Sequence, residues 1–216
     1  MDNTIIEMFK EKNDKILVEK LLIDVDNNDD SLKLTIKNKI ELVVSGKFLR
    51  KLNTILKNSG IDYDVKTLDE IVKNLKESIK QKTDELLDNR KNNICAEIRK
   101  DSTESENLFR TIDEQTEVLK SELEILINQL IYSELQNEIF SLYTFKSEEQ
   151  KEKISEALKK FDSVLTLNVL ESLSYRNGSL KNMMRETYAK VTELNEKTIE
   201  INSELTPDKV MKKEVA

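Results

Sequence analysis

The sequence lacks histidine completely, and among its 216 residues it has a single cysteine, Cys95. Without histidine the chain cannot form a Ser-His-Asp or Cys-His catalytic arrangement, a histidine zinc site or a Glu-x-x-His di-iron site. One cysteine cannot form a disulfide bond within the chain. Only carboxylate or lysine chemistry remains for an enzyme, and no pair of residues marks such a site. We therefore predict a protein that is not an enzyme and that has no cofactor and no metal.

Glycine and proline are scarce, with three and one occurrences. Because these residues favour tight turns, their scarcity favours long helices. Charged residues make up 36% of the chain and hydrophobic residues 38%, which fits helices with one apolar and one polar face. The abundance of lysine, asparagine and isoleucine suggests an AT-rich genome, as in low-GC bacteria and their phages or plasmids.

Long apolar runs are absent too, since none approaches the ~20 residues that a membrane-spanning helix requires. The chain starts with the polar residues Met1-Asp-Asn-Thr, which do not resemble a signal peptide. We therefore expect a cytoplasmic protein that does not bind a membrane. The net charge of −7 is uneven: residues 1–60 carry 11 bases and 10 acids, and the remainder carries 24 and 32. A nucleic-acid interface, which needs Lys and Arg, would therefore lie in the first sixty residues.

The first 63 residues contain the only strand-like pattern. Leu32, Leu34 and Ile36 alternate with polar residues, and this period of two is typical of a strand. We predict a small α/β head with a β-meander. Its elements are a short helix over 1–14, strands at about 16–25, 31–37 and 40–45, and a helix over 46–58 that Gly60 ends.

The acidic segment Asp24–Asp30 is interpreted as a turn between two of these strands. It matches the first three ligand positions of an EF-hand loop, at Asp24, Asp26 and Asn28. The sixth position needs glycine and the twelfth needs glutamate, but the chain has Asp29 and Thr35 there. The segment therefore lacks both the sharp turn and the bidentate ligand of a calcium site.

The rest of the chain has helical periodicity throughout. Four helices are predicted, at about 66–100, 103–145, 147–176 and 179–205, with Asn177-Gly178 as the stop between the last two. Capping patterns support the starts at Thr67–Glu70 and Ser147–Gln150. The predicted fold class is mainly α: an antiparallel helical bundle or coiled coil over 64–206, joined to the head of 1–63 and followed by a flexible polar tail over 207–216.

Two sets of residues are candidates for binding a partner. One is a heptad-spaced apolar stripe that could pair two copies of the chain. The other is a basic set on the predicted strand face and the helix after it, which could contact a protein or a nucleic acid. The stripe consists of Leu68, Val72, Leu75, Ile79 and Leu86, and the basic set consists of Lys33, Thr35, Lys37, Lys39, Lys47, Arg50 and Lys51.

These features predict a non-catalytic protein-protein interaction or assembly protein. Its partner would be a second copy of itself, a host protein, or both, as for an adaptor, a scaffold or an accessory protein of a phage or plasmid. The alternative is a DNA-binding accessory protein, in which the head contacts DNA and the helices oligomerise. The two hypotheses differ in whether the basic side chains share one exposed surface.

Overall fold

The computed structural model describes residues 3–42, 44, 48–61, 64–100, 105–130, 135–142, 145–159 and 162–204. Nearly all of these residues lie in α-helices, and the described parts contain no strand, so the prediction of a mainly helical protein is confirmed. The helices are α1 (Asn3–Leu42), α2 (Leu49–Asn58), α3 (Val65–Lys100), α4 (Ser105–Gln129), α5 (Leu135–Leu142), α6 (Glu148–Lys159) and α7 (Asp162–Glu204).

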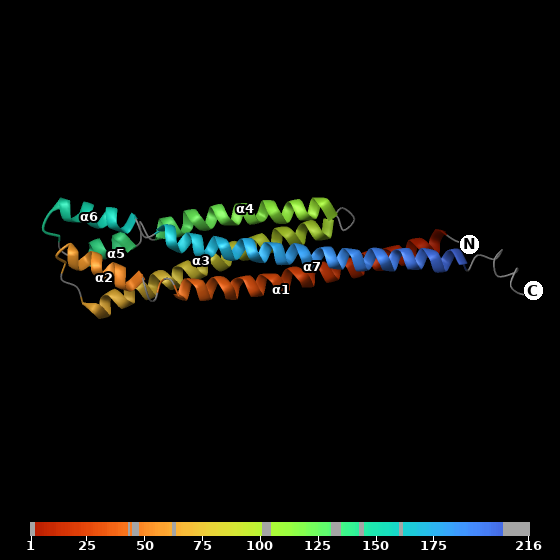
Figure 1. Cartoon of the computed structure of the whole chain (residues 1–216), viewed down its shortest axis with the longest axis horizontal. Coiled ribbons are helices and arrows are strands. Elements are labelled where there is room, and N and C mark those ends of the chain that lie inside the picture. The colour runs from red at the N-terminus through yellow and green to blue at the C-terminus, as the bar shows by residue number, and fades with distance from the viewer. Residues whose placement is uncertain are drawn as a thin grey trace, which may run out of the picture.

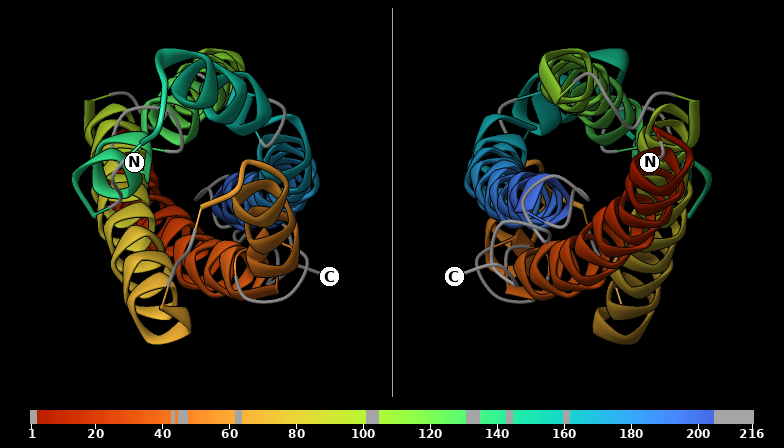
Figure 2. Two further views of the ribbon diagram at one scale, coloured as in Figure 1. Left: turned by 90° about the vertical axis from the view of Figure 1, so that its left-hand side faces the viewer. Right: turned by 90° about the vertical axis from the view of Figure 1, so that its right-hand side faces the viewer.

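Four long helices form an elongated bundle, in which α1 contacts α3 and α7, and α4 also contacts α3 and α7 (Figure 1). Each helix runs antiparallel to both of its neighbours, and the end-on views show the ring α1–α3–α4–α7 (Figure 2). The short helices α2, α5 and α6 gather at one end of the bundle. This up-and-down order buries the apolar stripe of every long helix along a common axis.

The predicted strands at 16–25, 31–37 and 40–45 are wrong, because the described residues of this segment up to Leu42 form the continuous helix α1. Leu32 and Ile36 are buried, whereas Leu34 between them is 62% exposed. The apparent alternation therefore hides a helical stripe, in which residues four apart share one face. The buried positions of this stripe are Leu17, Leu21, Val25, Leu32, Ile36 and Ile40.

The predicted helix stop at Asn177-Gly178 is also wrong, since α7 runs through it without a break. Gly60 is the one described residue with a positive φ, so Gly178 does not take the left-handed conformation of a helix cap. The Asn177 side chain is held by Asp113 in α4, with Nδ2 3.2 Å from Oδ1. Asn177 is thus fixed by a neighbouring helix instead of ending its own.

Several predicted helix ends are confirmed. Gly60, with φ of 68°, follows α2, where its N–H donates to Lys57 O and the Ile61 N–H donates to Leu56 O. These two bonds form a Schellman motif. At the start of α6, the Gln150 N–H donates to Ser147 Oγ and the Gln150 side chain accepts from the backbone N–H of Lys146.

One predicted cap is displaced. The Asp64 carboxylate caps α3 by accepting from the Lys66 N–H, in the role that the sequence assigned to Thr67. The division at residues 63 and 64 stays a prediction, and the predicted tail over 207–216 lies outside the described residues. The helix α1, which replaces most of the predicted head, packs along both α3 and α7.

Two apolar clusters fill the bundle, and they are separated by one polar layer. In each long helix, the last residue of one cluster and the first residue of the other are one heptad apart. These pairs are Val25–Leu32 in α1, Leu87–Ile94 in α3, Ile112–Leu119 in α4 and Leu173–Leu180 in α7. All four helices therefore interrupt their apolar stripe at the same level of the bundle.

Candidate interaction site

The described members of the predicted basic set do not form one exposed surface. Lys33 Nζ lies 2.9 Å from Asp29 Oδ2 and 2.5 Å from Asp88 Oδ1. Lys37 Nζ lies 2.9 Å from Asp84 Oδ2. Burial opposes the charged form of Lys33, but hydrogen bonds to Asp88 and Asp29 outweigh it and raise the pKa of the lysine. These two lysines therefore join α1 to α3.

The other members of the basic set are scattered. Residues two apart in a helix do not share a face, so Lys33 and Lys37 lie on one face of α1 and Thr35 and Lys39 lie on another. Thr35 donates to Ser31 O within α1, and Arg176 of α7 donates to its hydroxyl. Arg50 and Lys51 are exposed on α2, Lys39 is partly exposed on α1, and Lys47 lies outside the described residues.

The predicted oligomer stripe lies mainly inside the chain's own core. Leu68, Val72, Leu75 and Ile79 are all buried in one apolar cluster. They have no surface left for a second copy. Leu86 is only partly buried.

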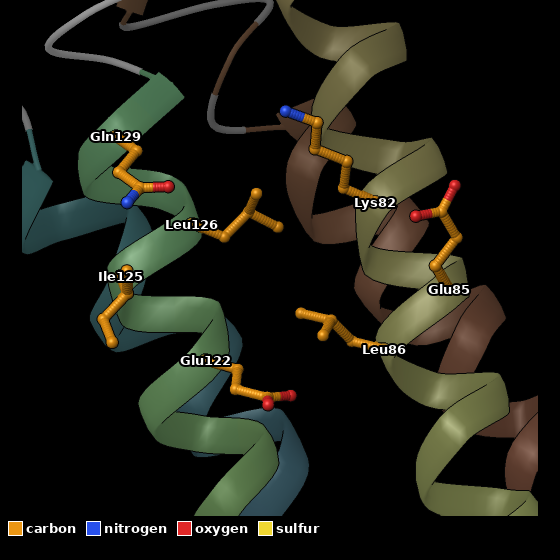
Figure 3. Close-up of a pocket in the computed structure, with 7 residues that line it drawn as sticks. All are labelled: Lys82, Glu85, Leu86, Glu122, Ile125, Leu126 and Gln129. Atoms are coloured by element: carbon orange, nitrogen blue, oxygen red, sulfur yellow. The ribbon is translucent and has the colours of Figure 1, made fainter.

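Leu86 lines a surface groove of about 360 Å³ between α3 and α4 (Figure 3). The side chains of Leu86 and Leu126 point toward each other across the groove. Charged side chains occupy both walls, with Lys82 and Glu85 on α3 and Glu122 on α4. The groove is therefore a narrow apolar strip with charged edges. In the described parts of the chain, no group of three or more acidic or cysteine side chains could hold a metal ion.

The polar layer inside the bundle is centred on Arg90 of α3, which is 4% exposed. Its Nε and Nη2 donate to Thr116 Oγ1 of α4 at 3.2 and 3.0 Å, and Nη2 also donates to Asn177 Oδ1 of α7 at 3.1 Å. Desolvation lowers the pKa of Arg90 to about 10, while the charge of Asp29 in α1 opposes this shift. The Arg90 guanidinium of α3 therefore contacts α4 and α7 by hydrogen bonds and attracts α1 through the charge of Asp29.

Asp29 is the buried acid of this layer, and burial raises the pKa of its carboxyl although Lys33 partly offsets the effect. Beside it, the buried Asn28 donates from Nδ2 to the Arg176 carbonyl at 2.9 Å. The two residues belong to the acidic segment that the sequence suggested as a turn. Asn28 instead joins α1 to α7 through this bond, and the charge of Asp29 attracts Arg90 and Lys91 of α3.

Helices α1 and α7 continue together beyond the bundle (Figure 1). Lys91 contacts Asp26, so the end of α3 at Lys100 lies level with Leu17 of α1. The rings of Phe109 and Tyr188 are 6.3 Å apart, so the start of α4 lies near residue 192 of α7. We refer to residues 3–16 of α1 and 192–204 of α7 as the α1–α7 extension.

The apolar stripe of α7 continues into this extension. Its spacing alternates between four and three residues through Leu180, Met184, Thr187, Val191, Leu194, Thr198 and Ile201. Leu180, Met184 and Val191 are buried by the bundle, but Leu194 is 47% and Ile201 57% exposed. One helix face is thus covered where α3 and α4 lie beside it and uncovered beyond them.

Helix α1 adds further exposed apolar side chains at the same level. Asn13 Nδ2 donates to Asn195 Oδ1 at 2.6 Å, which sets the antiparallel alignment. Phe9 lies one turn beyond Asn13, and Ile199 lies one turn beyond Asn195; both are exposed, as is Met8. The extension therefore presents Met8, Phe9, Leu194, Ile199 and Ile201 to its surroundings. Sequence reasoning missed this surface, although the spacing from Leu180 to Ile201 was a usable signal.

No family model, no curated protein and no solved structure matches this chain. Among the described helices, none is both long enough and apolar enough to cross a membrane.

Proposed function

We propose that this protein is a non-catalytic interaction or assembly protein that binds a protein partner through the α1–α7 extension. The observation that carries the proposal is the change in exposure along one stripe of α7. Val191 is 2% exposed, whereas Leu194, one turn further on, is 47% exposed. A heptad face that is apolar but uncovered is the usual docking surface for another amphipathic helix.

The extension favours a helical partner. It is a pair of antiparallel helices in which the apolar residues of α7 recur at heptad spacing, and such a pair gains most by receiving further helices with the same spacing. Two paired helical segments of about 13 residues bury little apolar surface alone, and most helical stability in proteins comes from the tertiary packing of an apolar face. A partner that covers Leu194 and Ile201 would supply this packing.

DNA binding has less support from the described residues. The basic side chains Lys33 and Lys37 are paired with acids of α3 and so are not free to neutralise phosphates. The extension itself carries acids along α7, at Glu193, Glu196, Glu200 and Glu204. These charges oppose contact with a nucleic acid.

Site-specific photo-crosslinking in the producing cell tests the proposal. A benzophenone amino acid replaces Leu194 in one variant and Val118 in the other. Val118 is a suitable control because it is 49% exposed on α4, away from the extension. We expect a discrete protein crosslink from position 194 that position 118 does not give. Equal or absent crosslinking at the two positions would overturn the proposed function.

A further inference from the structure

We infer that the partner of the α1–α7 extension is a second copy of this chain, bound antiparallel so that two extensions form a further four-helix bundle. This inference rests on the proposed function and names the partner. It is carried by the apolar stripe of α7, by the order of the helices in the ring, and by the space beyond the ends of α3 and α4.

The apolar stripe is continuous with the core of the bundle. Within the bundle, Met184 and Val191 are covered because α3 and α4 complete the ring. Beyond Lys100 and Ser105, where the described parts of these two helices end, the same face of α7 is left with Leu194 and Ile201 exposed. The missing element is therefore a pair of antiparallel helices in the positions that α3 and α4 occupy further along the axis.

A second α1–α7 extension is such a pair. In the bundle, α4 runs antiparallel to α7, and α3 runs antiparallel to α1 (Figure 1). A two-fold axis perpendicular to the helices places the partner's α7 antiparallel to α7, and the partner's α1 antiparallel to α1. The ring α1–α7–α7–α1 then repeats the alternation of the bundle. Closed two-fold dimers of this kind are the commonest symmetric assemblies.

The orientation follows from steric exclusion. The uncovered face lies on the side of the extension that α3 and α4 occupy within the bundle. A partner placed parallel to this chain would bring its own α3 and α4 toward the same space. An antiparallel partner places its bundle at the opposite end, so only the two extensions overlap. The expected dimer is therefore an elongated rod with a bundle at each end.

The heptad spacing also gives the register. With the two-fold axis near Thr198, Leu194 packs against Ile201 of the partner subunit, and Ile201 packs against the partner's Leu194. Thr198 then faces the partner's Thr198. The α7 half of each extension carries four acids and one base, Lys197. Because the two α7 segments repel each other, salt tightens the dimer by screening, whereas salt would weaken binding to a basic partner.

Sedimentation equilibrium on the full chain tests the stoichiometry. At tens of micromolar, we expect a mass of about twice the chain's 25.1 kDa. The double variant Leu194→Glu/Ile201→Glu should be monomeric at the same concentration. The matched control is Val118→Glu/Ile125→Glu, because these residues of α4 are also seven apart and are 49% and 53% exposed. A monomeric wild-type chain, or equal dissociation in both double variants, would overturn the inference.

A second pair of variants with opposite charges distinguishes loss of the dimer from misfolding. The chain with Leu194→Lys/Ile201→Lys should be monomeric alone and should form a heterodimer when mixed with Leu194→Glu/Ile201→Glu. Recovery of the double mass on mixing supports the pairing of residue 194 with residue 201. If both variants keep the helical circular dichroism of the wild type and no heterodimer forms, the proposed register is wrong.

Cysteine crosslinking tests the orientation in a Cys95→Ala background. Thr198→Cys should form a disulfide between copies under mild oxidation, because residue 198 lies near the axis and its two Cα atoms can come within ~7 Å. Leu194→Cys, on the same face and one turn away from residue 198, should not, since antiparallel copies place residue 194 opposite residue 201 of the partner subunit, so that the two copies of residue 194 lie ~10 Å apart along the helices. Crosslinking at both positions would indicate parallel copies and would contradict the inferred arrangement.

These outcomes separate the two proposals. A wild-type chain that stays monomeric when pure, but gives a crosslink of another mass from position 194 in the cell, would reject the second copy and keep the interaction function. A chain that is monomeric and also gives no specific crosslink would reject both.

Discussion

Replacing Arg90 by leucine is the sharpest perturbation of the bundle, because this guanidinium links the long helices at one level. Its three hydrogen bonds reach Thr116 and Asn177, and its charge favours the ionised form of Asp29. In the wild-type chain Thr116 Oγ1 lies 2.9 Å from Asn177 Oδ1, so these two side chains can bond to each other without Arg90. The loss is therefore that of the hydrogen bonds from Arg90 to Thr116 and Asn177 and of its attraction to Asp29, whose carboxyl is buried.

The size of the expected loss in the free energy of unfolding follows from the hydrogen bonds of Arg90. A hydrogen bond to a charged group contributes about 1.5–3 kcal/mol to the free energy of unfolding. Arg90→Leu loses such bonds to two partners, while Asp29 retains Lys33 at 2.9 Å, so we expect a loss of about 3 kcal/mol. Replacing both residues, in Arg90→Leu/Asp29→Leu, should recover part of this loss, because it also removes the buried carboxylate that Arg90 no longer attracts.

Urea unfolding followed by circular dichroism at 222 nm measures the effect. With an m-value of about 3 kcal/mol/M for a chain of this size, a loss of about 3 kcal/mol lowers the midpoint by about 1 M urea. The control is Arg110→Leu, because Arg110 is a surface residue paired with Glu114, and exposed pairs contribute less than about 1 kcal/mol. An Arg90→Leu midpoint equal to that of the control would contradict the role of Arg90 in holding the helices together. A double variant with a lower midpoint than Arg90→Leu would contradict it as well.

Three further predictions concern single sites. The hydrogen bond from Lys181 lowers the pKa of Asp113 in the folded state, so the stabilisation is complete above the ordinary pKa of 3.8 and is lost as pH falls through the lower folded value. Asp113→Asn should therefore lower the free energy of unfolding by less than about 1 kcal/mol at pH 6, because the Asp113 side chain is 52% exposed. In urea titrations at different pH values, this difference from the wild type should vanish near pH 2. Burial raises the pKa of the Cys95 thiol, so a colorimetric thiol reagent should label the native chain far more slowly than the chain in urea, and equal rates would contradict the buried position. Gly60→Ala should lower the stability of the protein by about 1 kcal/mol in thermal melts, since its φ is 68°. Gly178→Ala should raise the stability by about 1 kcal/mol, because an added methyl group at this helical site meets no other atom. A Gly178→Ala variant less stable than Gly60→Ala would show that α7 breaks at Gly178.

The helical class of this protein was predictable because glycine and proline are scarce and the apolar residues from 67 onward have helical spacing. The error in α1 has a physical cause. A run such as Leu32, Leu34 and Ile36 satisfies a period of two, but only the neighbouring chains decide whether Leu34 lies in the core or in solvent. Here α3 and α7 cover the face of Leu32 and Ile36.

The polar layer could not be found from the sequence. Asp29, Arg90, Thr116 and Asn177 are far apart along the chain, and each looks like an ordinary surface residue or a turn. Only the antiparallel alignment of the helices brings them to one level. The charges of Lys33 and Lys37 were similarly visible in the sequence, but their neutralisation by Asp88 and Asp84 depends on how α1 packs against α3.

Concentration-dependent amide hydrogen exchange is the most direct test that the α1–α7 extension binds a second copy. Purified protein is exchanged at about 1 µM and at about 100 µM, and peptides from 192–204 are compared with peptides from 105–129. Because helix ends with few buried contacts open readily, the amides of the extension should exchange fast in the dilute sample. A dimer through the α1–α7 extension should show slower exchange at the higher concentration in 192–204 and no change in 105–129. Exchange in 192–204 that does not depend on concentration would contradict it.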